Sequence, residues 1–168
     1  SYFLPQSSSQ LNDASIRGRT SANLAAWEMF KDYPLTGVGI SNYETLYFAY
    51  ARPLGLDTTA ADAEQPHNLY FQILAERGLL GFSVFVIVMF ITFRNLYRSK
   101  KLFEERQLFD LAGISSSLIV SLIIYMFSSM FLHDTFIRYF WILIGIAWSI
   151  PNLAENEGNN KHQIASSL

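Results

Sequence analysis

The sequence predicts an all-α integral membrane protein in which about three transmembrane helices follow a large external, partly helical loop. Only 15% of the 168 residues are charged, whereas an average soluble domain has about 25%. Two long stretches after residue 77 contain no charged residue. The first part of the chain, in contrast, mixes polar and apolar side chains as a segment in water does. We therefore divide the chain into an external region (residues 1–77), a transmembrane region (78–150) and a polar tail (151–168).

The composition excludes several classes of function. The net charge of −2 gives no support for nucleic-acid binding, which requires a basic face. The absence of cysteine rules out disulfides and thiolate metal sites. The chain starts at Ser1 with a polar run and shows no signal-peptide pattern. We expect it to be the C-terminal part of a longer protein that starts here inside a loop.

Three apolar stretches are candidates for membrane-spanning helices. Residues 78–93 and 111–132 carry no charge, and residues 139–150 continue apolar behind Arg138. A spanning helix needs about 20 apolar residues, and the arginines at the ends of the shorter stretches can extend toward the membrane surface. The alternative is a buried helical hairpin of a soluble protein. The predicted spans are about residues 78–96, 110–132 and 135–150.

The basic residues predict the orientation of these spans. Five of the twelve lysines and arginines lie between the first two spans, and such loops face the cytoplasm. Residues 1–77 and the turn at residues 132–135 then lie outside, in the periplasm of a double-membrane cell. The tail returns to the cytoplasm, and its composition is typical of a disordered segment.

The external region contains a first predicted helix that ends before Pro34. Its apolar stripe recurs at helical spacing from Ala22 to Phe30. Thr20 or Ser21 is the expected N-cap, and proline stops the helix at its other end.

A second predicted helix begins near Pro66 and ends near Gly78, which matches the preference for proline at helix starts and glycine at helix ends. Residues 40–64 between the two helices are predicted to form an irregular loop. The acidic residues of this loop do not have the spacing of a compact set of metal ligands, so we predict a solvated acidic loop at Asp57, Asp62 and Glu64.

His67 is the first candidate for chemistry. The sequence places it in the first turn of the second helix, where the positive end of the helix dipole disfavours the imidazolium. A neutral imidazole can accept a proton or orient an acceptor group. The alternative is an interfacial histidine that caps the helix or bonds to Asn68.

Arg19 is the second candidate. It is expected to precede the first helix, so its guanidinium and the free amides of that helix start could bind one anion. Pyrophosphate is the obvious anion beside a membrane. Arg17 competes for this role, and the alternative for both residues is a solvated loop arginine.

The segment from Pro34 to Gly39 ends the first helix and turns the chain tightly. We interpret Pro34, Gly37 and Gly39 as scaffold that positions Arg19 and the following loop. His133 and Asp134 end the second span on the outer face, where a tight turn needs polar residues and where an ionisable pair is also a candidate site.

These motifs together resemble the O-antigen ligase/polymerase superfamily of bacterial membrane glycosyltransferases. The resemblance rests on Arg19 followed by DYPLTGVG (residues 32–39), HNLY (67–70) and AERGLLG (75–81). The segment RYFWILIGIA (138–147) is similar to the family's last span. The resemblance covers about residues 15–150, and it marks Glu76 and Gly78 as parts of a structural motif.

The resemblance implies a function and a division of labour. It implies a donor glycan on undecaprenyl pyrophosphate, an essential arginine and histidine that correspond to Arg19 and His67, and transfer without a nucleotide sugar, cofactor or obligatory metal. In this scheme Arg19 neutralises the pyrophosphate leaving group, and His67 orients or deprotonates the acceptor hydroxyl. It also implies a multi-pass protein of the bacterial inner membrane whose active-site loop faces the periplasm. Arg17, Asn68 and Asp134 are further candidates for substrate binding, Asp134 by its location only.

Several alternatives stay open at this point. Many members have a tryptophan four residues after the arginine, whereas this chain has Asn23 there and Trp27 one turn later. The choice between Arg17 and Arg19 is therefore open. The acceptor is a lipid A-core sugar in a ligase, a growing repeat unit in an O-antigen or exopolysaccharide polymerase, and a protein hydroxyl in an oligosaccharyltransferase. A non-catalytic role as part of a flippase or assembly scaffold is the alternative outside the enzymes.

Overall fold

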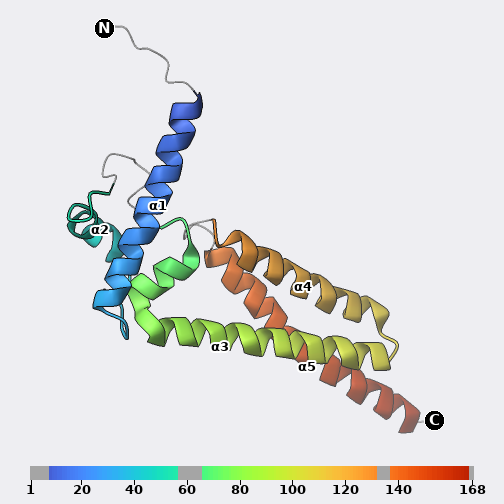
Figure 1. The fold of residues 1–168 in the computed structure, drawn as a ribbon. Coiled ribbons are helices and arrows are strands. Elements are labelled where there is room, and N and C mark those ends of the chain that lie inside the picture. Colours follow the sequence, from blue (N-terminus) through green and yellow to red (C-terminus); the bar gives the residue numbers. More distant parts are fainter. Residues whose placement is uncertain (1–7, 57–65, 132–136, 167–168) are drawn as a thin grey trace. The chain divides into compact units, whose positions relative to one another are not determined.

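The computed structural model describes residues 8–56, 66–131 and 137–166, and the regular elements within these ranges are all α-helices (Figure 1). The helices are α1 (Ser8–Asp32), α2 (Tyr43–Ala51), α3 (Leu69–Glu105), α4 (Phe109–Ser128) and α5 (Ile137–Ser166). The chain forms two compact units. The first unit runs to Val84 and includes the turn at Ser129, and the second contains residues 85–128 and α5.

The core of the first unit forms where α1 meets α2. The small side chains of Ala25 and Ala26 on α1 allow the two helices to approach closely, and the rings of Tyr43 and Tyr47 on α2 are buried against them. The hydroxyl of Tyr43 donates a hydrogen bond of 2.7 Å to the carbonyl of Ala22. Burial, followed by the neighbouring Tyr47, raises the pKa of Tyr43 well above its ordinary value, so this phenol stays a donor.

The first helix is longer than the sequence predicted. It begins at Ser8, so Thr20 and Ser21 lie inside α1 and neither is its N-cap. The hydroxyl of Thr20 instead donates to the carbonyl of Ile16, one turn earlier, at 2.9 Å. A single interior glycine such as Gly18 costs only about 1 kcal/mol, which a helix that is already nucleated tolerates.

The predicted irregular loop at residues 40–64 contains a helix. Its residues Tyr43, Tyr47 and Ala51 are all buried, and they recur at the four-residue spacing of one helical face. The prediction of an irregular loop was therefore wrong for α2, and the buried aromatic spacing could have indicated the helix. The acidic residues Asp57, Asp62 and Glu64 lie outside the described residues.

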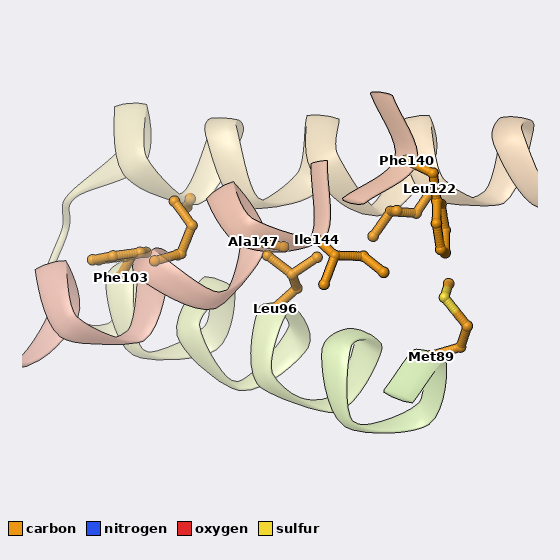
Figure 2. Packing of buried hydrophobic residues seen from close by; sticks show 9 residues of the cluster. Met89, Leu96, Phe103, Leu122, Phe140, Ile144 and Ala147 are labelled. Carbon is orange, nitrogen blue, oxygen red and sulfur yellow. The ribbon is translucent and has the colours of Figure 1, made fainter. Parts of the chain in front are cut away.

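The second unit has its own apolar core between the three helical segments α3, α4 and α5, shown in Figure 2. Phe140 of α5 stacks on Tyr125 of α4 with 4.8 Å between ring centroids. The indole nitrogen of Trp148 donates a hydrogen bond of 2.9 Å to the hydroxyl of Thr92. The side chains of this core are Met89, Leu96, Phe103, Ala112, Leu122, Phe140, Ile144, Ala147 and Ile150.

Two helices, α3 and α4, are long and apolar enough to cross a membrane. Only 17% of the most apolar stretch of α3 and 22% of that of α4 is buried, whereas the core helix of a soluble protein is mostly buried. Large apolar side chains such as Ile87, Phe90 and Ile124 are more than half exposed. This pattern fits lipid-facing helices better than the buried hairpin. The third predicted span, about residues 135–150, is not one of these two and stays a prediction.

The ends of the membrane segments differ from the expected ones. Helix α3 continues past residue 96 to Glu105, so the predicted basic loop is largely helical, with Lys100 paired to Glu104 at 3.6 Å. The tail predicted to be disordered continues α5 through Pro151 to Ser166. An interior proline removes one backbone bond and its ring crowds the preceding turn, at a cost of about 3 kcal/mol, and good helix formers such as Leu153 and Ala154 follow it.

Candidate active site in the first unit

A break in α3 at Gly78 is the feature on which the site is built. Gly78 has φ 60° and ψ −162°, values that no helical residue adopts, and Figure 1 shows the bend that results. The break prevents the carbonyls of Ala75 and Glu76 from accepting their usual bonds inside the helix. They accept instead from the loop after α1, through the amides of Val38 at 2.8 Å and Gly39 at 3.0 Å.

The same break leaves two amides without their helical acceptors, and the loop satisfies these as well. The amide of Leu79 donates to the carbonyl of Pro34 at 2.8 Å, and that of Leu80 donates to Leu35 at 3.1 Å. Two helical bonds are thus replaced by four bonds between PLTGVG and AERGLLG. The segment that the sequence predicted to be scaffold and the motif that contains Glu76 and Gly78 therefore form one backbone lock, defined here as residues 34–39 and 75–80.

The lock requires glycine for two reasons. Gly37 and Gly78 both have positive φ, 68° and 60°, which is costly for residues with a side chain. A β-carbon on Gly37 would collide with backbone atoms of Glu76 and Arg77, and one on Gly78 would collide with the backbone of Leu35. The sequence prediction that these glycines are structural is consistent with this geometry.

Glu76 belongs to the same lock. Its side chain is only 4% exposed, and its carboxylate lies 3.9 Å from the guanidinium of Arg77. A buried carboxylate needs such partners, because burial disfavours an isolated charge.

His67 lies just before α3 rather than in its first turn, which corrects the sequence prediction. The helix begins at Leu69, and its cap is Asn68, whose side-chain oxygen accepts from the amides of Tyr70 at 3.0 Å and Phe71 at 3.3 Å. This capping bond fixes where the helix starts. His67 is half-buried next to the positive end of the helix. Asn68 therefore has a structural task in addition to the substrate binding predicted for it.

Arg19 lies inside α1, three turns after its start, so the predicted anion site of Arg19 and free helix-terminal amides was wrong. Interior helix amides bond to carbonyls four residues earlier and do not bind a ligand. The guanidinium itself is exposed and remains available for an anion. Arg17 is also exposed, but two residues correspond to about 200° around a helix, so the two arginines point to opposite sides.

Two pockets lie along α1. The first has a volume of about 460 Å³ and is lined by Thr20, Asn23, Leu24, Trp27 and Phe71. It lies where α1 meets α3, and the rings of Trp27 and Phe71 pack edge to face with 6.4 Å between centroids. Its lining includes Thr20, which follows Arg19 in the chain, and Phe71, which is four residues after His67.

Arg17 itself lines a second pocket of about 420 Å³, which involves Gly55 and Leu56 after α2 instead of α3. Of the two arginines, Arg17 lines a pocket and Arg19 lines neither of these two. Asp134 and His133 lie outside the described residues.

The comparisons with known proteins identify the family. A family model described as O-antigen ligase matches residues 2–86, which are 85 of the 168 residues. The chain belongs to the O-antigen ligase family. No curated protein and no solved structure matches the chain.

Membership of the O-antigen ligase family and the two exposed apolar helices identify a membrane protein of the ligase and polymerase type. The matched range contains residues 2–84 of the first unit, and thus Arg19, His67 and both halves of the backbone lock. Sequence reasoning identified these motifs but not the pocket between α1 and α3, because its lining comes from two helices far apart in the chain.

Proposed function

We propose that this protein is a glycosyltransferase that moves a saccharide from an undecaprenyl-pyrophosphate carrier to an acceptor hydroxyl. One observation carries the proposal. The family match includes the backbone lock, which joins the loop after α1, the helix that bears Arg19, to α3, the helix that follows His67. The donor and the acceptor are membrane-bound or large, which suits a protein with two apolar helices long enough to cross a membrane.

The reaction needs charge stabilisation more than it needs a metal or cofactor. The acceptor oxygen attacks the anomeric carbon of the donor, the bond from that carbon to the pyrophosphate oxygen breaks, and undecaprenyl pyrophosphate leaves with the bonding electrons. The exposed guanidinium of Arg19 stabilises this anion. His67 takes the proton of the acceptor hydroxyl, since an imidazole beside a helix N-terminus favours its neutral form.

We propose further that the first unit faces the periplasm of a bacterial inner membrane. The basic end of α3 then lies in the cytoplasm. Cysteine at Thr45, exposed on α2, is expected to react with an impermeant thiol reagent in whole cells, and cysteine at Lys101, exposed near the end of α3, is not. The reverse labelling pattern would overturn this orientation and the mechanism with it.

The function is tested by the surface glycans of a deletion strain that carries the intact protein or its His67→Ala variant. We expect the variant to reach the membrane in normal amount and to lose transfer. Accumulation of lipid-linked polymer beside an unmodified lipid A-core would identify a ligase, arrest at a single repeat unit would identify a polymerase, and loss of glycan from proteins would identify an oligosaccharyltransferase.

The matched control is His162→Ala, which removes a histidine from the last part of α5. We expect wild-type glycans from this control. An unchanged glycan pattern from His67→Ala, with the variant present in the membrane, would contradict the proposal and favour a flippase or scaffold component.

A further inference from the structure

Both halves of the backbone lock present large apolar side chains on the outside of the first unit. Leu35 of the loop is 61% exposed, and Leu79 and Leu80 of α3 are 44% and 62% exposed. Tyr33, just before the loop, is also more than half exposed. All four residues belong to the first unit, so their arrangement is set within that unit. Exposed apolar residues that gather at one place indicate a surface that meets an apolar partner.

The lock ties the loop to the first turn of the apolar part of α3. The carbonyl of Leu35 accepts from the amide of Leu80 at 3.1 Å, and the carbonyl of Pro34 accepts from the amide of Leu79 at 2.8 Å. Two successive backbone bonds hold the segments side by side. The loop at Leu35 therefore lies at the same depth, relative to a membrane, as the start of the apolar stretch of α3.

The length of this apolar stretch determines the depth. Residues 78–93, between Arg77 and Arg94, form an uncharged run of 16 residues, which extends about 24 Å at a rise of about 1.5 Å per residue. The hydrocarbon core of a bilayer is about 30 Å thick. A stretch that is shorter than the core is immersed over its whole length, while the arginines at its ends reach toward the surface. Leu79 and Leu80 are therefore in lipid, although they stand at the beginning of the stretch.

We propose that the loop half of the lock, with Tyr33 and Leu35, is inserted into the bilayer at the boundary between the headgroups and the acyl chains. The partner is the phospholipid around α3, because the exposed side chain of Leu35 continues the lipid-facing surface that begins at Leu80.

The order of side chains along the loop suits such a boundary. The exposed charges of Lys31 and Asp32 come first, Tyr33 follows, and the purely apolar Leu35 comes last. Tyrosine is favoured where a membrane meets water. The inference depends neither on the proposed donor and acceptor nor on the proposed orientation, since both leaflets have this boundary.

The test is the surroundings of a fluorescent probe at position 35. The intact protein, in a form whose only cysteine is that of Leu35→Cys, is labelled with the environment-sensitive dye NBD and placed in vesicles of phosphatidylethanolamine and phosphatidylglycerol. We expect emission that is shifted to the blue relative to the dye in water. Lipids that carry a nitroxide near the headgroup should remove most of the fluorescence, and lipids with the nitroxide deep in the acyl chain should remove less.

Ile16→Cys is the matched control. Ile16 is 62% exposed, about as much as Leu35, but it lies about 24 Å along α1 from Asp32 and next to the exposed Arg17. We expect water-like emission from a probe at this position and no quenching by either lipid.

Three results would overturn the inference. Water-like emission at position 35 would place the loop outside the membrane. Blue-shifted emission that neither nitroxide lipid quenches would assign the apolar surface to a protein partner. Equal quenching at positions 35 and 16 would show that the first unit adsorbs to lipid without a specific contribution from the lock. The measurement requires no transfer, so it is separate from the test of the proposed function.

Discussion

The backbone lock needs glycine at position 37 for its positive φ and for the close approach of the two motifs, and Gly37→Ala disturbs both. Alanine at a positive φ costs about 1–2 kcal/mol, and the collision with the backbone of Glu76 and Arg77 forces the two motifs apart. Separation breaks up to four backbone bonds, each of which contributes about 0.5–1.5 kcal/mol. The local opening free energy of the lock should therefore fall by about 3–8 kcal/mol.

Gly55 provides the matched control for this substitution. It has φ 63° like Gly37, but nothing lies within 4 Å of the position of its β-carbon. Gly55→Ala therefore carries only the conformational cost of about 1–2 kcal/mol. The difference between the two variants isolates the close approach of the two motifs.

Hydrogen exchange measures this difference at the amides of the lock. In Gly37→Ala the protection of Val38, Gly39, Leu79 and Leu80 should fall by at least about a hundredfold, because exchange reports local opening. In Gly55→Ala these four amides should keep wild-type protection. Equal protection in the two variants would refute the idea that the lock depends on backbone contact at Gly37.

Three further predictions follow from single contacts. Asn68→Ala removes the cap of α3 and should lower stability by about 1 kcal/mol in thermal unfolding, whereas Asn68→Asp should retain it; equal losses would refute the capping role. Trp148→Phe deletes the donor to Thr92 and should destabilise the second unit by about 0.5–1.5 kcal/mol, because the buried hydroxyl loses this hydrogen bond but still donates to the carbonyl of Val88; an unchanged melting temperature would show that the bond is dispensable. Burial, and then the 2.8 Å hydrogen bond to Asp32, raise the pKa of Tyr50 from 10.0 to about 12. As the pH rises, the unfolded chain therefore loses this proton before the folded chain does, and the stabilisation that is present below pH 10 is lost as the pH rises toward 12. Tyr50→Phe should reduce this decline in the free energy of unfolding; an identical decline in the variant would contradict the assignment.

The sequence predicted the parts of the fold that depend on composition and local rules. The uncharged stretches indicated the helices α3 and α4, and the glycine signal correctly placed a break at Gly78. The glycine-rich segment after Pro34 was interpreted as scaffold, but its partner was not predicted. Backbone bonds between residues 34–39 and 75–80 leave no trace in side-chain periodicity, so local rules could not show them.

The errors concern helix boundaries and a short helix. Arg19 was placed before α1 because Thr20 and Ser21 are good caps in isolation, whereas the chain before them is helical enough to continue. His67 was placed inside α3 because proline favours the first helical turn, whereas Asn68 caps the helix later. Both errors changed the predicted electrostatics of the site: the role proposed for Arg19 rests on its guanidinium alone, without free helix-terminal amides.

The central claim is that Arg19 and His67 act together on a lipid-linked glycan. Its most direct test is transfer by the purified intact protein in nanodiscs, with a radiolabelled undecaprenyl-pyrophosphate glycan as donor, for His67→Ala, Arg19→Gln and the matched control Arg17→Gln. We predict that the first two variants lose transfer by about a hundredfold or more at unchanged melting temperature, and that Arg17→Gln stays near the wild type. Transfer at the wild-type rate by His67→Ala or by Arg19→Gln would contradict the account.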